Sequence, residues 1–351
     1  MTVVEGEGLA EFVEGAVSVR QIRLGMQPLR LDEEGFALTH PALAAPSVGE
    51  ATNGIRLRFS TDATAIELEV SQILSDSIRR ACANGSMALP AYDLVVAVLP
   101  RGRVATALSE GVHQIRFEGL PGRSVVCELW LPHNIAVVLH KLILDEGTAS
   151  VAHDDRPKWV VHGSSITHDS LAGGPSETWP AIVARQADWH LTAFGFRGEC
   201  HLDPFVTREI ARLPADLITL ELGINIHNSQ GLRHRTLAPA LHGFLQVIRD
   251  GQPNTGVIVI SPIFGGERET SVTTVSPDGH DLRGDLTLEM IRGTIADAVD
   301  IRRRRGDSLL HSVDGLTLLG QRDSHVFPDG LHPDRSGVEL LISRLVPQLT
   351  R

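Results

Sequence analysis

The sequence predicts an α/β protein in two parts, an antiparallel β-sandwich followed by a parallel sheet with helices on both faces. Up to about residue 147, short runs such as 55–59 and 65–70 alternate apolar with charged residues, and glycine or proline stands between runs. This alternation is typical of antiparallel strands with one solvated face. After Trp159, continuous apolar runs alternate with segments of helical period. That second pattern is typical of parallel strands in a three-layer α/β/α arrangement.

The length of the chain favours two domains, because 351 residues exceed the usual size of one. The segment 145–158 is polar, contains small residues and carries a proline near its end, so it is the expected boundary. We therefore expect a jelly-roll-like β-sandwich over residues 1–150 and the α/β domain over 157–351.

The individual elements follow from the same runs. In the first part, strands are expected within 55–59, 65–70, 113–122 and 124–132. In the second part, strands are expected within 159–163, 191–196, 217–223, 257–262 and 309–315, and helices within 177–188, 236–250 and 337–346. Ligands of such parallel sheets bind beyond the carboxyl ends of the strands, so functional residues are expected there.

Composition and charge restrict the class of partner. Apolar residues make up 42% and charged residues 21% of the chain, which is ordinary for a soluble globular protein. With 32 basic against 43 acidic residues, the net charge of −11 argues against a nucleic-acid partner. The basic run 301–306 follows a helical pattern and is interpreted as a solvated helix end. No apolar run approaches the roughly 20 residues that span a bilayer, so no membrane partner is expected.

Two further features indicate a reducing compartment. The amino terminus carries acidic residues and lacks the basic and apolar regions of a secretory signal. Cys82, Cys127 and Cys200 are an odd number at wide spacing, without the pairing of a disulfide framework or a metal site. We therefore expect a cytoplasmic protein that binds no metal.

The predicted strand ends carry residues that bear chemistry. The first strand ends in Gly163, Ser164 and Ser165, where the glycine is expected to allow a tight turn at positive φ. A serine in that place can be a nucleophile, or it can be an ordinary helix N-cap. Gly198 follows the second strand and Asn225 follows the third.

A loop near the carboxyl end adds an acid and a base, Asp329 and His332. Acyl transfer by a serine needs a nucleophile, a base oriented by an acid, and donors for the developing oxyanion. His332 could deprotonate a serine hydroxyl while Asp329 orients its imidazole. Backbone N–H groups of Ser165 and Gly198, with the side-chain amide of Asn225, could form the oxyanion hole.

Each of these residues also has a plainer interpretation. Asn225 and Gly198 could simply form turns, Asp329 could form an Asx-turn, and His332 could be a surface histidine. Their order along the chain and their places at predicted strand ends favour catalysis. No G-x-S-x-G and no G-x-G-x-x-G occur, so neither the nucleophile elbow of α/β-hydrolases nor a dinucleotide cofactor is expected.

The ordered blocks resemble those of the GDSL or SGNH hydrolase superfamily, which is named for Ser, Gly, Asn and His. The segment "GSSIT" resembles the first block, often G-D-S, and implies that Ser165 is the nucleophile, with Ser164 at the usual aspartate position. The segment "GFRGEC" is similar to the second block and implies an oxyanion role for Gly198. The segment "LGIN" is similar to the third and implies the same for Asn225, with Ile226 where the family has aspartate.

The segment "DGLH" resembles the last block of the family and implies that Asp329 and His332 are the acid and the base. The resemblance covers residues 157–351. It implies a flavodoxin-like SGNH catalytic domain that transfers acyl groups through a covalent acyl-enzyme without a cofactor.

A β-sandwich ahead of these blocks resembles a subgroup that includes a salicylyl acyltransferase of a tetracycline-type biosynthetic pathway. The resemblance implies transfer of an aromatic acyl group from a thioester co-substrate to a hydroxyl of a polyketide-type small molecule, as in antibiotic biosynthesis. Other members look like esterases, so hydrolysis or deacetylation of small-molecule or carbohydrate esters stays the alternative. The expected partners are a small-molecule acyl donor and acceptor, whose identities the sequence does not give, and it does not give the oligomeric state either.

Two other functions are less favoured, a carbohydrate esterase whose N-terminal sandwich binds sugar and a binding protein without catalysis. Sugar-binding modules use exposed aromatic side chains, yet residues 1–150 hold only Trp130 and Tyr92 beyond four phenylalanines. A non-catalytic binding protein would have no need of an intact serine, histidine and aspartate.

Overall fold

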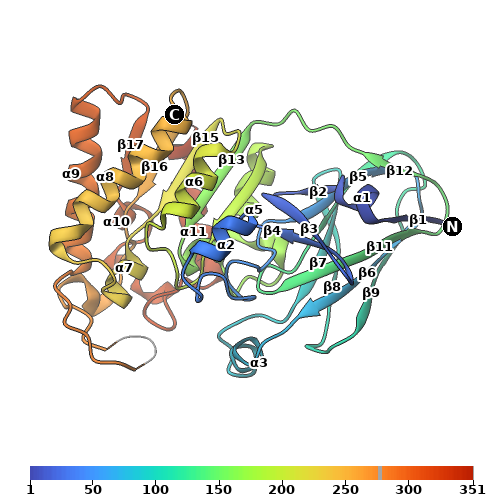
Figure 1. Cartoon of the computed structure of the whole chain (residues 1–351), viewed down its shortest axis with the longest axis horizontal. Coiled ribbons are helices and arrows are strands. Elements are labelled where there is room, and N and C mark those ends of the chain that lie inside the picture. Colours follow the sequence, from blue (N-terminus) through green and yellow to red (C-terminus); the bar gives the residue numbers. More distant parts are fainter. Residues whose placement is uncertain (276–278, 351) are drawn as a thin grey trace. The chain divides into compact units, whose positions relative to one another are not determined.

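A computed structural model describes residues 1–275 and 279–350 of the chain (Figure 1). The chain forms two compact units. The first comprises Met1–Arg156 and Asp169–Ala193, and the second comprises Pro157–His168 and Phe194–Arg351. Because the chain leaves the second unit after His168 and returns at Phe194, neither unit is one continuous stretch. The boundaries 1–150 and 157–351 stay a prediction.

The first unit contains two six-stranded antiparallel sheets, as the alternating pattern predicts. One has the order β3-β4-β11-β6-β9 with β1 beside β11, and the other has the order β12-β5-β10-β7-β8 with β2 beside β5. The strands are β1 (Thr2–Glu5), β2 (Val13–Glu14), β3 (Ser18–Ile22), β4 (Gly25–Leu29), β5 (Arg56–Thr61), β6 (Ala65–Ile73), β7 (Ala91–Val96), β8 (Leu99–Ala105), β9 (Val112–Glu118), β10 (Val125–Trp130), β11 (Ala136–Leu144) and β12 (Ala149–Val151). The helical segments are α1 (Gly6–Ala10), α2 (Glu33–Leu38), α3 (Asp76–Ala83), η1 (Pro175–Glu177) and α5 (Trp179–Ala187).

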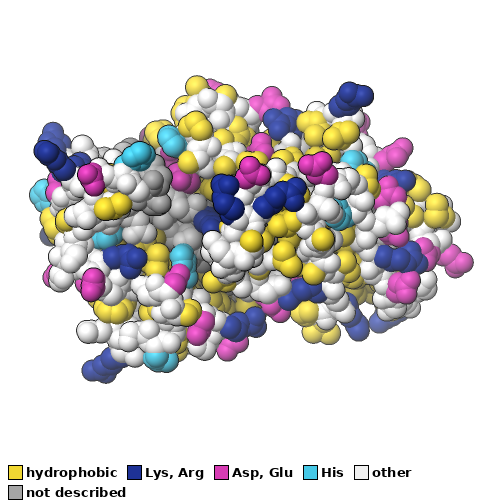
Figure 2. All heavy atoms as spheres, turned by 90° about the horizontal axis from the view of Figure 1, so that it is seen from below, with side chains coloured by type: hydrophobic (Ala, Val, Ile, Leu, Met, Phe, Trp, Pro, Cys, Tyr) yellow, Lys and Arg dark blue, Asp and Glu magenta, His cyan; other side chains and the backbone are white. Residues whose placement is uncertain are grey.

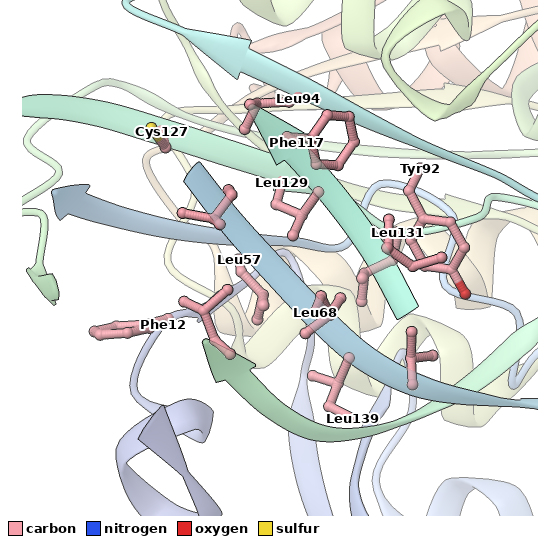
Figure 3. Packing of buried hydrophobic residues seen from close by; sticks show 14 of the residues in the cluster. Phe12, Leu57, Leu68, Tyr92, Leu94, Phe117, Cys127, Leu129, Leu131 and Leu139 are labelled. Atoms are coloured by element: carbon pink, nitrogen blue, oxygen red, sulfur yellow. The ribbon is translucent and has the colours of Figure 1, made fainter. Parts of the chain in front are cut away.

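The core of the first unit lies between the inward faces of these two sheets (Figure 3). Leu57 and Leu129 come from one sheet, Leu68 and Leu139 come from the other, and all four are fully buried. Cys127 lies in the same cluster, so it is a small buried apolar side chain, as expected. The two sheets are therefore a sandwich held by apolar burial.

The second unit contains a sheet in the order β14-β13-β15-β16-β17, in which β13, β15, β16 and β17 pair in parallel. Numbered along the chain this is 2-1-3-4-5, the flavodoxin-like order. The strands are β13 (Lys158–Gly163), β14 (His190–Gly195, which runs from the first unit into the second), β15 (Leu217–Glu221), β16 (Gly256–Ile260) and β17 (Leu310–Val313). The helical segments are α4 (Ser165–His168), α6 (Pro204–Arg212), α7 (Ile224–Ser229), α8 (His234–Gly251), η2 (Gly266–Glu269), α9 (Leu288–Arg304), α10 (Gly315–Leu318), η3 (Gln321–Val326) and α11 (Arg335–Leu349).

Successive residues of β13, β15 and β16 are buried. Side chains of a strand alternate between faces, so both faces of this sheet are covered. In α8, the buried residues Leu237, Leu241, Phe244 and Ile248 recur at helical spacing. Helix α8 packs between α6 and α9 (Figure 1). The expected α/β class, with a covered parallel sheet after an antiparallel sandwich, is thus confirmed.

Charged side chains are distributed without one dominant sign on the face shown in Figure 2, where acidic and basic groups are interspersed. Arg302, Arg303 and Arg304 lie in the last turn of α9, as expected for the basic run. Within the described residues, no helix combines the length and the apolar character needed to cross a membrane.

Candidate active site

Ser165 and His332 meet at the carboxyl edge of the parallel sheet. Ser165 is the first residue of α4, and one residue, Ser164, separates it from the end of β13 at Gly163. Its Oγ lies 2.8 Å from Nε2 of His332. The other ring nitrogen of His332, Nδ1, lies 2.6 Å from Oδ2 of Asp329. Because a carboxylate only accepts, Nδ1 carries the proton toward Asp329, and Nε2 is left to accept from the Ser165 hydroxyl.

The loop that carries Asp329 holds it in its ionised form. Its Oδ1 accepts from the backbone N–H groups of Leu331 at 2.9 Å and His332 at 2.7 Å. Burial by itself would raise the pKa of Asp329, but the hydrogen bonds from the His332 ring and from these N–H groups outweigh it and hold the pKa below its usual range. The side chains of Asp329 and His332 are 52% and 33% exposed, so both reach solvent.

Gly163 is required for space rather than for backbone conformation, and the expected positive φ is wrong at this position. The glycines at positive φ include Gly198 and Gly223 but not Gly163. A Cβ atom at Gly163 would lie 2.2 Å from Oγ1 of Thr167 and 2.7 Å from a carboxylate oxygen of Glu221. Real Cβ atoms essentially never come this close to another heavy atom, so any larger residue would push the serine turn away from β15.

Two hydrogen bonds from backbone N–H groups link the second block to the strand before the nucleophile and to the third block. The N–H of Phe196 donates to the carbonyl oxygen of Gly163 at 2.8 Å, which ties the loop after β14 to the end of β13. The N–H of Cys200 in this loop donates to Oδ1 of Asn225 at 3.1 Å. Since an N–H requires an acceptor, this bond fixes the amide orientation of Asn225 and frees its Nδ2 to donate elsewhere. Asn225 lies in the first turn of α7 and is 4% exposed.

Gly198 lies in the same loop, at φ 78° and with open space where a Cβ would stand. Here the left-handed backbone is the reason for glycine. The loop 196–200 is therefore bonded to Gly163 near its start and to Asn225 at its end. All five residues expected at the site, Ser165, Gly198, Asn225, Asp329 and His332, lie in the second unit.

Glu221 is a site residue that the sequence reasoning missed. It is the last residue of β15, 4% exposed, and its Oε2 lies 2.7 Å from Oγ of Ser164. Burial raises the pKa of Glu221 to about 7, against hydrogen bonds from Ser164 and Thr167, which lower it. A signal was present in the sequence, because an acidic residue at the end of the apolar run 217–222 is costly unless it has partners.

The literal letters G-D-S-L occur elsewhere in the chain, at 306–309, and do not form the site. This segment precedes β17, so it lies at the amino edge of the sheet, opposite the edge that carries Ser165. Its Asp307 is paired with Arg249, with Oδ1 and Nη2 3.0 Å apart. The nucleophile position therefore depends on the place in the fold rather than on the letters.

One cluster in the described residues has the spacing of metal ligands, although no metal was expected. Glu14, Asp154 and His190 of the first unit bring their ligand atoms within 4.8 Å of one another. Arg56 donates to Glu14 at 2.8 Å and Arg156 donates to Asp154 at 2.6 Å. Because the arginines already neutralise these carboxylates, the cluster does not fit a cation.

The fold and the site together define the class of protein. A flavodoxin-like sheet with serine, glycine, asparagine and an aspartate–histidine loop at its carboxyl edge is the arrangement of the SGNH hydrolases. The chain belongs to the GDSL-like lipase/acylhydrolase family, whose model matches residues 157–341. A second model, described as the N-terminal domain of SsfX3, matches residues 12–140.

Solved structures are similar over nearly the whole chain. The salicylyl-acyltransferase SsfX3 from a tetracycline biosynthetic pathway matches with a TM-score of 0.84 at 25% identity, over 98% of this chain and 95% of its own. A protein described as a GDSL-like lipase, from Bacteroides ovatus, matches with a TM-score of 0.75 at 18% identity, over 99% and 97%. A family two carbohydrate esterase from Clostridium thermocellum matches with a TM-score of 0.64 at 14% identity, over 88% and 95%. A search of curated proteins by sequence gives no match.

Proposed function

We propose that this protein transfers acyl groups through a covalent intermediate on Ser165, with His332 as the base and Asp329 as the residue that orients it. The observation that carries the proposal is the hydrogen-bonded series from Ser165 through His332 to Asp329, at 2.8 and 2.6 Å. This series provides a nucleophile, a base in the required tautomer and an ionised acid. Membership of the acylhydrolase family supports the same chemistry.

The first half-reaction would form the acyl-enzyme. Oγ of Ser165 attacks the carbonyl carbon of the donor while its proton passes to Nε2 of His332. The tetrahedral intermediate then collapses, the bond to the leaving sulfur or oxygen breaks, and His332 gives its proton to the leaving group. In the second half-reaction, an acceptor hydroxyl loses its proton to His332 and attacks the acyl carbon, and Ser165 regains the proton as it leaves.

The donors for the oxyanion would be the backbone N–H groups of Ser165 and Gly198 and Nδ2 of Asn225. The bond from Cys200 to the oxygen of Asn225 supports the last assignment, because it leaves the donor end of the amide for the substrate. The proposed reaction needs no metal or cofactor, since the nucleophile, base and donors all come from the chain.

The favoured reaction is transfer of an aromatic acyl group, with salicylyl as the first to test, from a thioester to a hydroxyl of a polyketide-type molecule. It is supported by the 25% identity and the 98% coverage of the likeness to SsfX3, and by the match to the SsfX3 N-terminal model. A biosynthetic role of this kind would fit a cytoplasmic protein.

Hydrolysis of an ester is the second candidate, because the family model describes lipases and acylhydrolases, and both kinds of enzyme hydrolyse esters. Both reactions pass through the same acyl-enzyme, and they differ only in whether water or an alcohol attacks it. The shape of the pocket and the exclusion of water decide between them.

The test is intact-mass analysis after incubation with a panel of activated esters and acyl thioesters, salicylyl and acetyl among them. We expect an added mass equal to one acyl group, absent in Ser165→Ala. Faster loss of that mass with an added polyketide alcohol than in buffer indicates transfer, and an equal rate indicates hydrolysis. No acyl adduct from any donor, together with full turnover by Ser165→Ala, would refute the proposal.

A further inference from the structure

A buried carboxylate lies directly beneath the turn that carries Ser165. Oε2 of Glu221 accepts from the backbone N–H of Ser164 at 2.8 Å, from Oγ of Ser164 at 2.7 Å and from Oγ1 of Thr167 at 3.1 Å. All these bonds end on one oxygen. The other oxygen, Oε1, is buried and has no hydrogen-bond partner among the described residues. The hydrogen bonding of this carboxylate is thus directed at the serine turn.

The same network holds the residues immediately before and after Ser165. Oγ of Ser164 also accepts from the N–H of Ile166 at 3.1 Å. The residues before and after the nucleophile are therefore held by Glu221, either directly or through the Ser164 hydroxyl. Ser165 itself does not bond to Glu221, and its hydroxyl is directed to His332.

We propose that Glu221 is a positioning residue that fixes the turn 164–167 from strand β15 and thereby aims the Ser165 hydroxyl at His332. The inference rests on the proposed function of Ser165. Three hydrogen bonds from one turn to one rigid, buried acceptor restrict that turn to a single conformation. Gly163 contributes to this arrangement, because the lack of a Cβ atom at this position lets the Glu221 carboxylate approach the turn.

This arrangement also accounts for Ser164, which stands where the family often has an aspartate. With a serine at 164, the turn has no carboxylate of its own, and Glu221 at the end of β15 supplies one. The two residues are complementary, since the Ser164 hydroxyl donates to Glu221 while it accepts from Ile166. Displacing a nucleophile by about 1 Å can cost about 100-fold in rate, so the effect of losing Glu221 should appear in the chemical step.

The experiment compares Glu221→Ala and Glu221→Gln with wild type in three measurements: kcat and KM with an activated ester, the rate of inactivation by a serine-directed phosphonate, and Tm. In Glu221→Ala we expect kcat and the inactivation rate to fall together by about 100-fold. KM should stay within about threefold of wild type, because substrate contacts are unchanged. Glu221→Gln should recover most of the loss, since its amide oxygen still accepts from the turn.

A matched control lies two residues earlier on the same strand. Oγ1 of Thr219 is buried and accepts from Nε1 of Trp159 at 2.9 Å. Thr219→Val removes a buried hydrogen bond of β15 without touching the serine turn, so it should lower Tm and leave kcat and the inactivation rate unchanged. A Glu221→Ala protein that behaves like Thr219→Val, with lowered Tm and unchanged rates, overturns the proposal.

Two variants cover the case in which Glu221→Ala does not fold. Ser164→Ala and Thr167→Val each remove one donor to Glu221, and each should slow phosphonate inactivation about tenfold. Wild-type inactivation rates in both overturn the proposal as well. Failure of the proposed function is distinguishable, because wild type would then carry no phosphonate on Ser165, whereas failure of this inference leaves that label forming at equal rates in all variants.

Discussion

The amide of Asn225 provides a sharp test of the oxyanion assignment. Truncation in Asn225→Ala removes Nδ2, and losing one such donor typically lowers kcat by about 10² to 10³, or about 3–4 kcal/mol, with little change in KM. It also removes the acceptor of the Cys200 N–H, 3.1 Å away, so the buried bond between the loop 196–200 and α7 is lost. That loss should cost about 1–3 kcal/mol of stability.

Three variants separate these two effects when kcat, KM and Tm are measured on each preparation. Asn225→Ala loses donor and acceptor, whereas Asn225→Asp keeps the acceptor for Cys200, loses the Nδ2 donor and adds a carboxyl group where the oxyanion would form. Ser229→Ala is the control, because its hydroxyl donates to the backbone oxygen of Asn225 at 2.9 Å within α7, so its loss leaves the Asn225 side-chain amide intact. We expect both Asn225 variants to lose kcat and Ser229→Ala to retain it. If Asn225→Asp and Asn225→Ala turn over at the wild-type rate and differ only in Tm, Asn225 is a structural residue and the oxyanion reasoning is refuted.

The remaining predictions concern the nucleophile, metals and pH. A serine-directed phosphonate should label Ser165, and peptide mapping that finds the adduct on Ser164 would contradict the assignment. Activity should survive a chelator, and a loss that zinc reverses would exclude the metal-independent mechanism. Burial raises the pKa of Glu221 in the folded protein to about 7, above the ordinary value of 4.5. Between pH 4.5 and pH 7 the folded state therefore binds a proton at Glu221 that the unfolded state releases. Relative to Glu221→Gln, wild type should therefore lose about 3 kcal/mol of unfolding free energy as the pH rises from 4.5 to 7. Denaturant titrations of both proteins at several pH values measure this, and parallel curves would show that Glu221 is not perturbed.

The sequence alone determined the architecture, because the period of apolar residues reports which faces of a strand are buried. The alternation in β5 and β6 predicted antiparallel strands, one in each sheet of the sandwich, and the continuous runs of β13, β15 and β16 predicted a sheet covered on both faces. The solvated face expected for β5 is wrong at Arg56, which is 1% exposed and donates to Glu14. The same runs located the strand ends, and in a parallel sheet these ends meet at one edge. This is why the sequence alone predicts that residues as distant as Ser165 and His332 lie together.

Only the tertiary structure decided how these residues are held. Gly163 was expected at positive φ, yet it is needed because Thr167 and Glu221 fill the space of a side chain. In the sequence, Glu221 is a single charged residue at the end of a predicted strand. Its partners Ser164 and Thr167 lie more than 50 residues away, so no local pattern connects them to it. Local patterns record burial and backbone preference, which each residue carries by itself. A close approach between two strand ends depends on how both are packed, and no single stretch of sequence contains that distance.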